Sequence, residues 1–216
     1  MGDDAKVASF WNYYFRQLPN SGRALGIVLN GYSTPGRHYH GLSHLVHGLA
    51  QVDDLPDMPI VDEEALVLAW FCHDLRYNAR IPDLANVKAS ARRAVILSKA
   101  MGFEHKEQRN SAKAVLATCH SLPPESLIEK CIVDLDLSIL GADKLTYKNY
   151  EAGIRKEYAW VPFEDYKKAR VSVLQNFLEK ERLYWLDFFH DKYDASRKEN
   201  LKWSIRVLEA NTDFLK

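Results

Sequence analysis

"DEEALVLAWFCHD" (residues 62–74) is the stretch that decides the fold. Three acidic residues open it, where the dipole of a helix favours negative charge. Its middle is apolar on every face, which predicts a buried helix. It ends in His73 and Asp74, and ionisable side chains at the end of a buried helix need partners because an unpaired buried charge is costly. We therefore expect other helices to bring polar side chains to this pair.

Proline and glycine separate further helical patterns. Loops or turns are expected at residues 18–23, 31–37, 54–59, 80–83 and 122–125. Between them, apolar residues recur at three- and four-residue spacing; Val171, Leu174 and Leu178, for example, share one helical stripe. The only weak strand candidate is "IVLNGY" (27–32). We therefore predict an all-α chain.

The composition is that of a soluble globular protein. A length of 216 residues predicts a single domain, 1–216, and 29 basic against 29 acidic residues give no global attraction to nucleic acid or to an anionic membrane. The longest apolar run, residues 65–72, is too short to span a bilayer, and the start lacks the features of a signal peptide. Three isolated cysteines, Cys72, Cys119 and Cys131, are expected to be free thiols in a reducing compartment. We expect a cytoplasmic protein with no membrane partner.

"RHYHGLSHLVHGL" (37–49) contains four of the eight histidines. His40, His44 and His47 fall at helical spacing, so they share one side of a helix. This pattern is typical of a solvated polar face, or of a metal or acid–base site that has partners elsewhere in the chain.

A second carboxylate is expected from "CIVDLDLSILG" (131–141). In a helix its two aspartates point about 200° apart. The i±3 and i±4 neighbours of Asp136 are apolar, whereas Asp134 faces a mixed surface that includes Lys130. We therefore expect Asp136 to be the aspartate held in the core, where a metal ion would provide the cation that it needs.

Together these residues form a candidate metal site. Histidine nitrogens and carboxylate oxygens suit a first-row divalent metal, and the absence of thiolates from the set disfavours structural zinc. The alternative is a purely structural network of buried hydrogen bonds.

With these residues identified, the chain resembles the HD superfamily of metal-dependent phosphohydrolases. The signature of that family is a histidine, an adjacent His-Asp pair and a distant aspartate, here His44, His73, Asp74 and Asp136. The chain is most similar to the branch of predicted metal-dependent HD phosphohydrolases, over roughly residues 32–205. The other motifs of that branch are "RxYHxxxH" at 37–44, "DLxILG" at 136–141 and "EY…R…VL…FL" at 157–178.

The resemblance implies an HD-domain helical bundle with a C-terminal helical extension. The metal-site core would span about residues 32–145, with helices of residues 146–216 packed on it. The cofactor would be a divalent ion of manganese, magnesium, iron, cobalt, nickel or zinc. Only His105 and His120 lie between the His-Asp pair and Asp136, which favours one metal ion over two.

The resemblance also implies roles in catalysis. His40 would be the general acid, and Asp74 would orient or deprotonate the attacking water. Spacing alone leaves another possibility, because histidines at i and i+4 can both bind one ion. The residues expected to contact the substrate are Arg37, Arg76, Tyr77 and His120.

The expected function is an enzyme that hydrolyses a nucleotide or another small phosphoester. Two alternatives stay open: a di-iron oxygenase of the HD type, and a metal-retaining protein that binds nucleotides without catalysis. The second is motivated by "LANVKASA" (84–91), where Val87 stands at the position at which the branch carries a glutamate.

Overall fold

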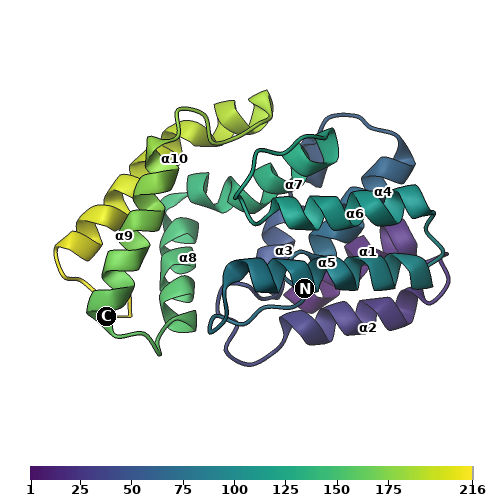
Figure 1. Cartoon of the computed structure of the whole chain (residues 1–216), viewed down its shortest axis with the longest axis horizontal. Coiled ribbons are helices and arrows are strands. Elements are labelled where there is room, and N and C mark those ends of the chain that lie inside the picture. Colours follow the sequence, from purple (N-terminus) through teal and green to yellow (C-terminus); the bar gives the residue numbers. More distant parts are fainter. Residues whose placement is uncertain (216) are drawn as a thin grey trace. The chain divides into compact units, whose positions relative to one another are not determined.

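The structure is a computed structural model that describes residues 1–215. Within these residues all regular secondary structure is helical, which confirms the all-α prediction. The elements are α1 (Asp3–Phe15), α2 (Ser21–Tyr32), α3 (Leu42–Leu49), η1 (Val52–Asp54), α4 (Ile60–Cys72), α5 (Asp83–Ala100), α6 (His105–Ala117), α7 (Leu127–Leu137), η2 (Ser138–Gly141), α8 (Lys144–Glu157), α9 (Phe163–Glu179) and α10 (Asp187–Glu209) (Figure 1).

The chain divides into two compact units, Met1–Asp136 and Leu137–Lys216. This boundary lies before the one near residue 145 that the sequence suggested. The expectation of a single domain stays a prediction.

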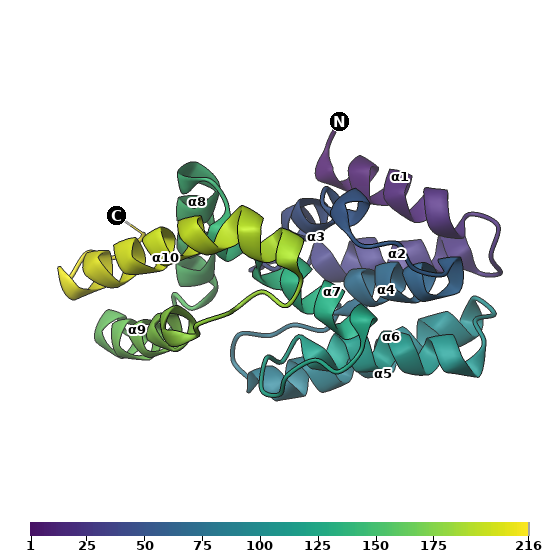
Figure 2. The same cartoon turned by 90° about the horizontal axis from the view of Figure 1, so that it is seen from above.

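The first unit is built around α4. All residues from Ala65 to Cys72 are buried, as expected for a helix that is apolar on every face. Figure 2 shows α4 between α1 on one side and α5 and α6 on the other. Trp11 of α1 meets Phe71 of α4 edge to face, with ring centroids 5.1 Å apart. The helix that directly precedes the His-Asp pair is therefore the core of this unit.

Residues 27–32 form the second half of α2, so the strand candidate was wrong. The β-branched Ile27 and Val28 favour a strand locally. However, Ala24, Val28 and Tyr32 are buried at a spacing of four residues, and burial of this helical stripe outweighs the local preference.

The second unit contains a buried ion pair between α8 and α9. Glu151 is 0 % exposed and accepts two hydrogen bonds from Arg170, of 2.8 and 3.2 Å. The hydroxyl of Tyr147 donates to Glu151 at 2.9 Å, and the hydroxyl of Tyr150 accepts from Arg170 at 2.8 Å. Burial would lower the pKa of Arg170, but the neighbouring charge of Glu151 outweighs this and raises it, so the guanidinium keeps its charge.

The three cysteines are free thiols. Cys72 and Cys131 are buried, and burial raises the pKa of each thiol to about 12, whereas Cys119 is half-buried.

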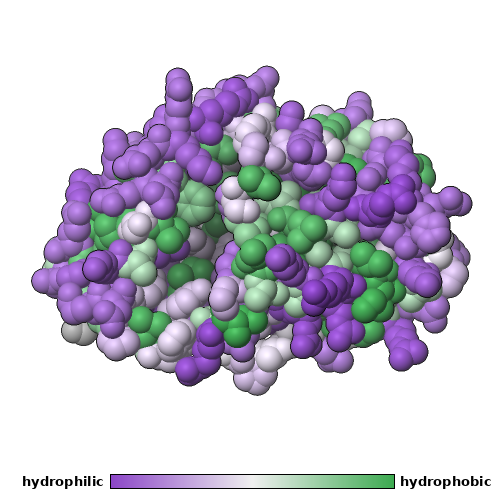
Figure 3. Space-filling model, viewed as in Figure 1, coloured by the Kyte–Doolittle hydropathy of each residue, from purple (hydrophilic) through white to green (hydrophobic). Residues whose placement is uncertain are grey.

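On the face drawn in Figure 3, hydrophobic side chains interrupt a hydrophilic surface. Over residues 1–215 no helix combines the length and the apolar character that crossing a membrane requires.

We predict that Glu151→Gln lowers the free energy of unfolding by about 3–5 kcal/mol, because it leaves the Arg170 charge buried without its counter-ion. The matched control is Glu164→Gln, which removes an exposed pair with Lys167 and should cost less than about 1 kcal/mol. Urea unfolding followed by circular dichroism measures both values. Equal losses for the two variants would contradict the structural role of the buried pair.

Candidate metal centre

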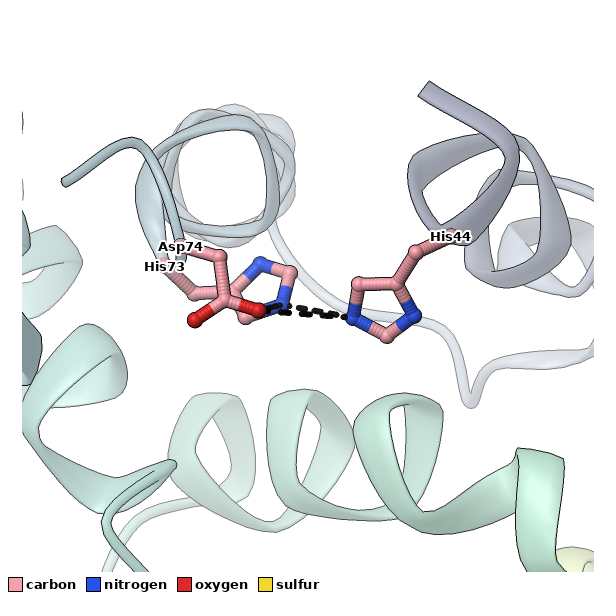
Figure 4. Close-up of side chains that lie close together, drawn as sticks. All are labelled: His44, His73 and Asp74. Atoms are coloured by element: carbon pink, nitrogen blue, oxygen red, sulfur yellow. Dashed lines mark hydrogen bonds and ion pairs between the residues drawn. The ribbon is translucent and has the colours of Figure 1, made fainter. Parts of the chain in front are cut away.

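Four titratable side chains from three parts of the first unit come together. His44 lies in α3, His73 and Asp74 directly follow α4, and Asp136 is the penultimate residue of α7. Figure 4 shows the rings of His44 and His73 and the carboxylate of Asp74 pointing toward one another. The structure thus brings together the four residues that the sequence suggested as metal ligands.

The donor atoms lie within a few ångströms of one another. The two Nε2 atoms of His44 and His73 are 2.9 Å apart. Oδ2 of Asp74 lies 3.2 Å from Nε2 of His73 and 3.7 Å from Nε2 of His44. From Asp136, Oδ1 lies 3.3 Å from Nε2 of His44 and 3.7 Å from Nε2 of His73.

His44, His73 and Asp74 could hold a metal ion, because each offers a ligand atom within 4.8 Å of the others. The observed separations match the distance of about 3 Å between neighbouring ligands that lie about 2.1 Å from one ion. Two imidazole nitrogens with carboxylate oxygens also make up a donor set that divalent first-row metals favour. The residues present therefore fit such an ion, and Asp136 is placed to add a further oxygen.

Close packing of α3 on α4 brings the two histidines together. A Cβ atom at Gly48 would lie 2.1 Å from the indole of Trp70, so only glycine allows this approach of the helices. The indole Nε1 of Trp70 donates to the carbonyl of Leu45 at 3.1 Å. The ring of His73 stacks on the same indole at 4.3 Å, and the ring of His44 lies 5.2 Å from it.

One of the two histidines has a fixed tautomer. Nδ1 of His73 lies 2.7 Å from the carbonyl of Trp70, which can only accept, so Nδ1 carries a proton and Nε2 faces the cluster. Nδ1 of His44 is buried without a hydrogen-bond partner among residues 1–215.

The charges of the cluster are mutually dependent. Burial lowers the pKa of His44. Burial alone would also lower the pKa of His73, but the charges of Asp74 and Asp136 raise it to about 9. The histidines in turn hold the pKa values of both carboxyls below their usual range although burial opposes this. At neutral pH, the positive charge of protonated His73 therefore partly balances the negative charge of the two carboxylates. A divalent cation would take over this role.

No family model, curated protein or solved structure matches this chain. Beyond the four donors, a histidine and a guanidinium group contact residues of the centre.

His120, which the sequence suggested as a substrate contact, lies against Asp136. Its Nε2 is 2.9 Å from Oδ2 of Asp136, while Oδ1 of the same carboxylate faces His44 and His73. His120 follows the end of α6 and has a φ of +53°, in the left-handed region that few non-glycine residues adopt. The contact of its imidazole with Oδ2 orients the carboxylate of Asp136.

The expectation that Asp136 is the more deeply buried aspartate of α7 was wrong. Asp134 is 0 % exposed, whereas the side chain of Asp136 is 17 % exposed. The apolar neighbours of Asp136 correctly pointed to the inside of the unit, but that side of α7 meets the polar cluster. The mixed surface around Asp134 is covered by other parts of the fold.

His40 lies beside the four donors. Its ring stacks on Tyr77 at 4.0 Å, and its centroid is 6.0 Å from that of His44. His40 is not among the described residues, His44, His73 and Asp74, whose ligand atoms all lie within 4.8 Å of one another.

The two arginines expected to contact phosphate differ in exposure. Arg76 is exposed, and its backbone N–H donates to the hydroxyl of Ser90. Arg37 donates to the backbone carbonyls of His40, Asp74 and Leu75.

Sequence reasoning missed Asp83. Asp83 is exposed, and the pKa of its carboxyl is raised by partial desolvation and by the negative charges of Asp74 and Asp136. It begins α5 and precedes Val87 by four residues, so the two positions share one side of the helix. Val87 is 2 % exposed. The spacing of four residues between Asp83 and Val87, where a glutamate was expected, was the signal in the sequence that could have pointed to Asp83.

We predict that affinity for Co²⁺ rises with pH. Metal ligation requires neutral imidazole, so below the His73 pKa of about 9 the cation must displace a proton. Affinity should increase about tenfold per pH unit between about pH 6 and about pH 8. Calorimetric titration in buffers of different protonation enthalpy should show release of about one proton. An affinity independent of pH would contradict this charge balance.

We further predict that His120→Ala weakens Co²⁺ binding about tenfold, because Asp136 loses the group that orients it. His105→Ala is the matched control, since His105 is an exposed histidine at the start of α6, the helix that precedes His120. Its affinity should equal that of the parent. Parent-like affinity in His120→Ala would show that His120 does not support the centre.

Proposed function

We propose that this chain is a metal-dependent phosphohydrolase of the HD type, acting on a nucleotide or another small phosphoester. The observation that carries the proposal is the meeting of His44, His73, Asp74 and Asp136, whose donor atoms approach to 2.9–3.7 Å. These are the positions at which the sequence resembles the HD superfamily. The order of residues in the chain and their proximity in space thus support the same proposal.

The proposed cofactor is a divalent ion of manganese, magnesium, iron, cobalt, nickel or zinc, held by these four residues. When bound, such an ion lowers the pKa of a coordinated water toward neutrality and polarises a phosphoryl oxygen. The chain itself supplies the orientation of the reactants and the proton transfers.

Asp74 is suited to orient the attacking water. Its pKa is held low by His73 in spite of burial, so the carboxylate stays ionised and accepts a hydrogen bond. His40 is suited to protonate the leaving oxygen, because imidazole transfers protons readily near neutral pH. The stacking of His40 on Tyr77 limits the orientations of its ring. The exposed guanidinium of Arg76 could pair with phosphate oxygens.

A second candidate function is metal-dependent nucleotide binding without turnover. The observation that favours it is Val87, a buried apolar side chain at the position where the HD branch carries a glutamate. If that glutamate is needed to activate water, this chain would bind the substrate and leave it intact.

We predict phosphate release when the purified chain, supplied with each divalent metal in turn, is screened against nucleotides and generic phosphoesters. Asp74→Ala should lose at least about a hundredfold in rate, because it removes both a ligand and the group that orients water. Asp57→Ala, which alters an exposed aspartate away from the centre, is the control and should match the parent.

The outcomes separate the alternatives. Hydrolysis that persists unchanged in Asp74→Ala would overturn the mechanism. Nucleotide binding without product release would favour the non-catalytic candidate. Oxygen uptake with iron and no phosphate release would favour an HD-type oxygenase.

A further inference from the structure

Arg37 uses its guanidinium to hold backbone carbonyls. Nη1 donates to the carbonyl of His40 at 3.1 Å and to the carbonyl of Asp74 at 2.7 Å. Nη2 donates to the carbonyl of Leu75 at 3.2 Å. A single nitrogen thus joins the backbone of the candidate acid to the backbone of a candidate metal ligand.

Two of these carbonyls belong to the turn that follows α4. The C-terminal end of a helix carries partial negative charge, which a cation at this place stabilises. The backbone N–H of Asp74 donates to the hydroxyl of Tyr32 at 3.1 Å. The backbone of Asp74 is therefore held through both its N–H and its carbonyl by residues from the end of α2 and the loop after it.

Aromatic rings enclose the same guanidinium. Its central carbon lies 5.2 Å from the ring of Tyr32 and 5.7 Å from the ring of Tyr77, which stacks on His40. The remaining nitrogen, Nε, is buried and has no hydrogen-bond partner among residues 1–215. The guanidinium is thus directed at the protein rather than at a substrate.

We propose that Arg37 is a positioning residue that fixes His40 relative to the turn bearing His73 and Asp74. The role of Arg37 in catalysis rests on the proposed function, whereas its role in holding the metal ligands in place does not. The inference replaces the phosphate contact expected of Arg37 from the sequence. The proposal implies that lysine cannot replace arginine here, because a planar fork reaches several carbonyls at once and the ammonium of lysine is a point charge that cannot.

Three variants test the proposal. Arg37→Lys keeps the charge, Arg37→Ala removes the whole group, and Arg23→Ala is the matched control because Arg23 is an exposed arginine of α2. Circular dichroism establishes that each variant folds. Co²⁺ affinity is measured by calorimetry, and kcat and KM are measured with whichever phosphoester the parent hydrolyses best.

We expect Arg37→Lys and Arg37→Ala to lose about tenfold or more in Co²⁺ affinity, since groups that orient ligands have effects of this size. At saturating Co²⁺, the kcat of both variants should fall while KM stays within about twofold of the parent value, because Arg37 does not contact the bound substrate. Methylguanidinium added to Arg37→Ala should restore part of the metal affinity. Arg23→Ala should match the parent throughout.

Two results would overturn the proposal. One is parent-like Co²⁺ affinity in a folded Arg37→Lys. The other is a rise in KM with unchanged kcat and unchanged metal affinity, which is the signature of a direct substrate contact. If the parent hydrolyses no phosphoester, the proposed function fails, but the metal affinities of the folded Arg37→Lys still decide whether Arg37 supports the centre.

Discussion

The first unit depends on one electrostatic constraint: two imidazoles and two carboxylates share a largely buried space and must balance their charges. His44 and His73 are almost fully buried, and Asp74 and Asp136 are only slightly more exposed. Ionised carboxylates at such a site are costly unless a cation accompanies them. A proton on His73 meets part of this need, and a divalent cation would meet it more completely.

The surrounding structure holds these groups in place. The ring of His73 stacks on the indole of Trp70, and the ring of His44 lies tilted against it. The carbonyl of Trp70 accepts a hydrogen bond from Nδ1–H of His73, and Gly48 permits α3 to approach. Arg37 holds the turn that contains Asp74, and His120 orients Asp136. Ligands that are fixed by such supporting contacts lose less entropy when an ion binds, so the centre is organised in advance.

The second unit illustrates a different use of buried charge. Glu151 and Arg170 pair directly and satisfy each other, with tyrosine hydroxyls completing their hydrogen bonds. A pair that is neutral by itself leaves no demand for an external cation. The contrast explains why an excess of carboxylate in the first unit points to a ligand, and why the paired charges in the second unit point to stability.

Much of this could be predicted from the sequence. Helical periodicity and the apolar run of residues 65–72 were enough to predict an all-helical chain with α4 buried, because these patterns reflect local geometry and hydrophobicity. The same patterns could not decide residues 27–32, where burial of a helical stripe overrode local strand preference. Residue type and order limited the candidate ligands to the histidine stripe of residues 40, 44 and 47, the His73-Asp74 pair and Asp136, and the resemblance to the HD superfamily singled out His44 from that stripe.

Only the tertiary structure decided which partners each group has. Local patterns placed Asp136 in the core, yet the packing of whole helices buried Asp134 more deeply. The position of Arg37 beside the centre also depends on a contact between distant segments, its hydrogen bond to the carbonyl of Asp74. The physical reason is that a side chain's chemistry is set by its own atoms, whereas its charge state and role are set by neighbours that only the folded chain supplies.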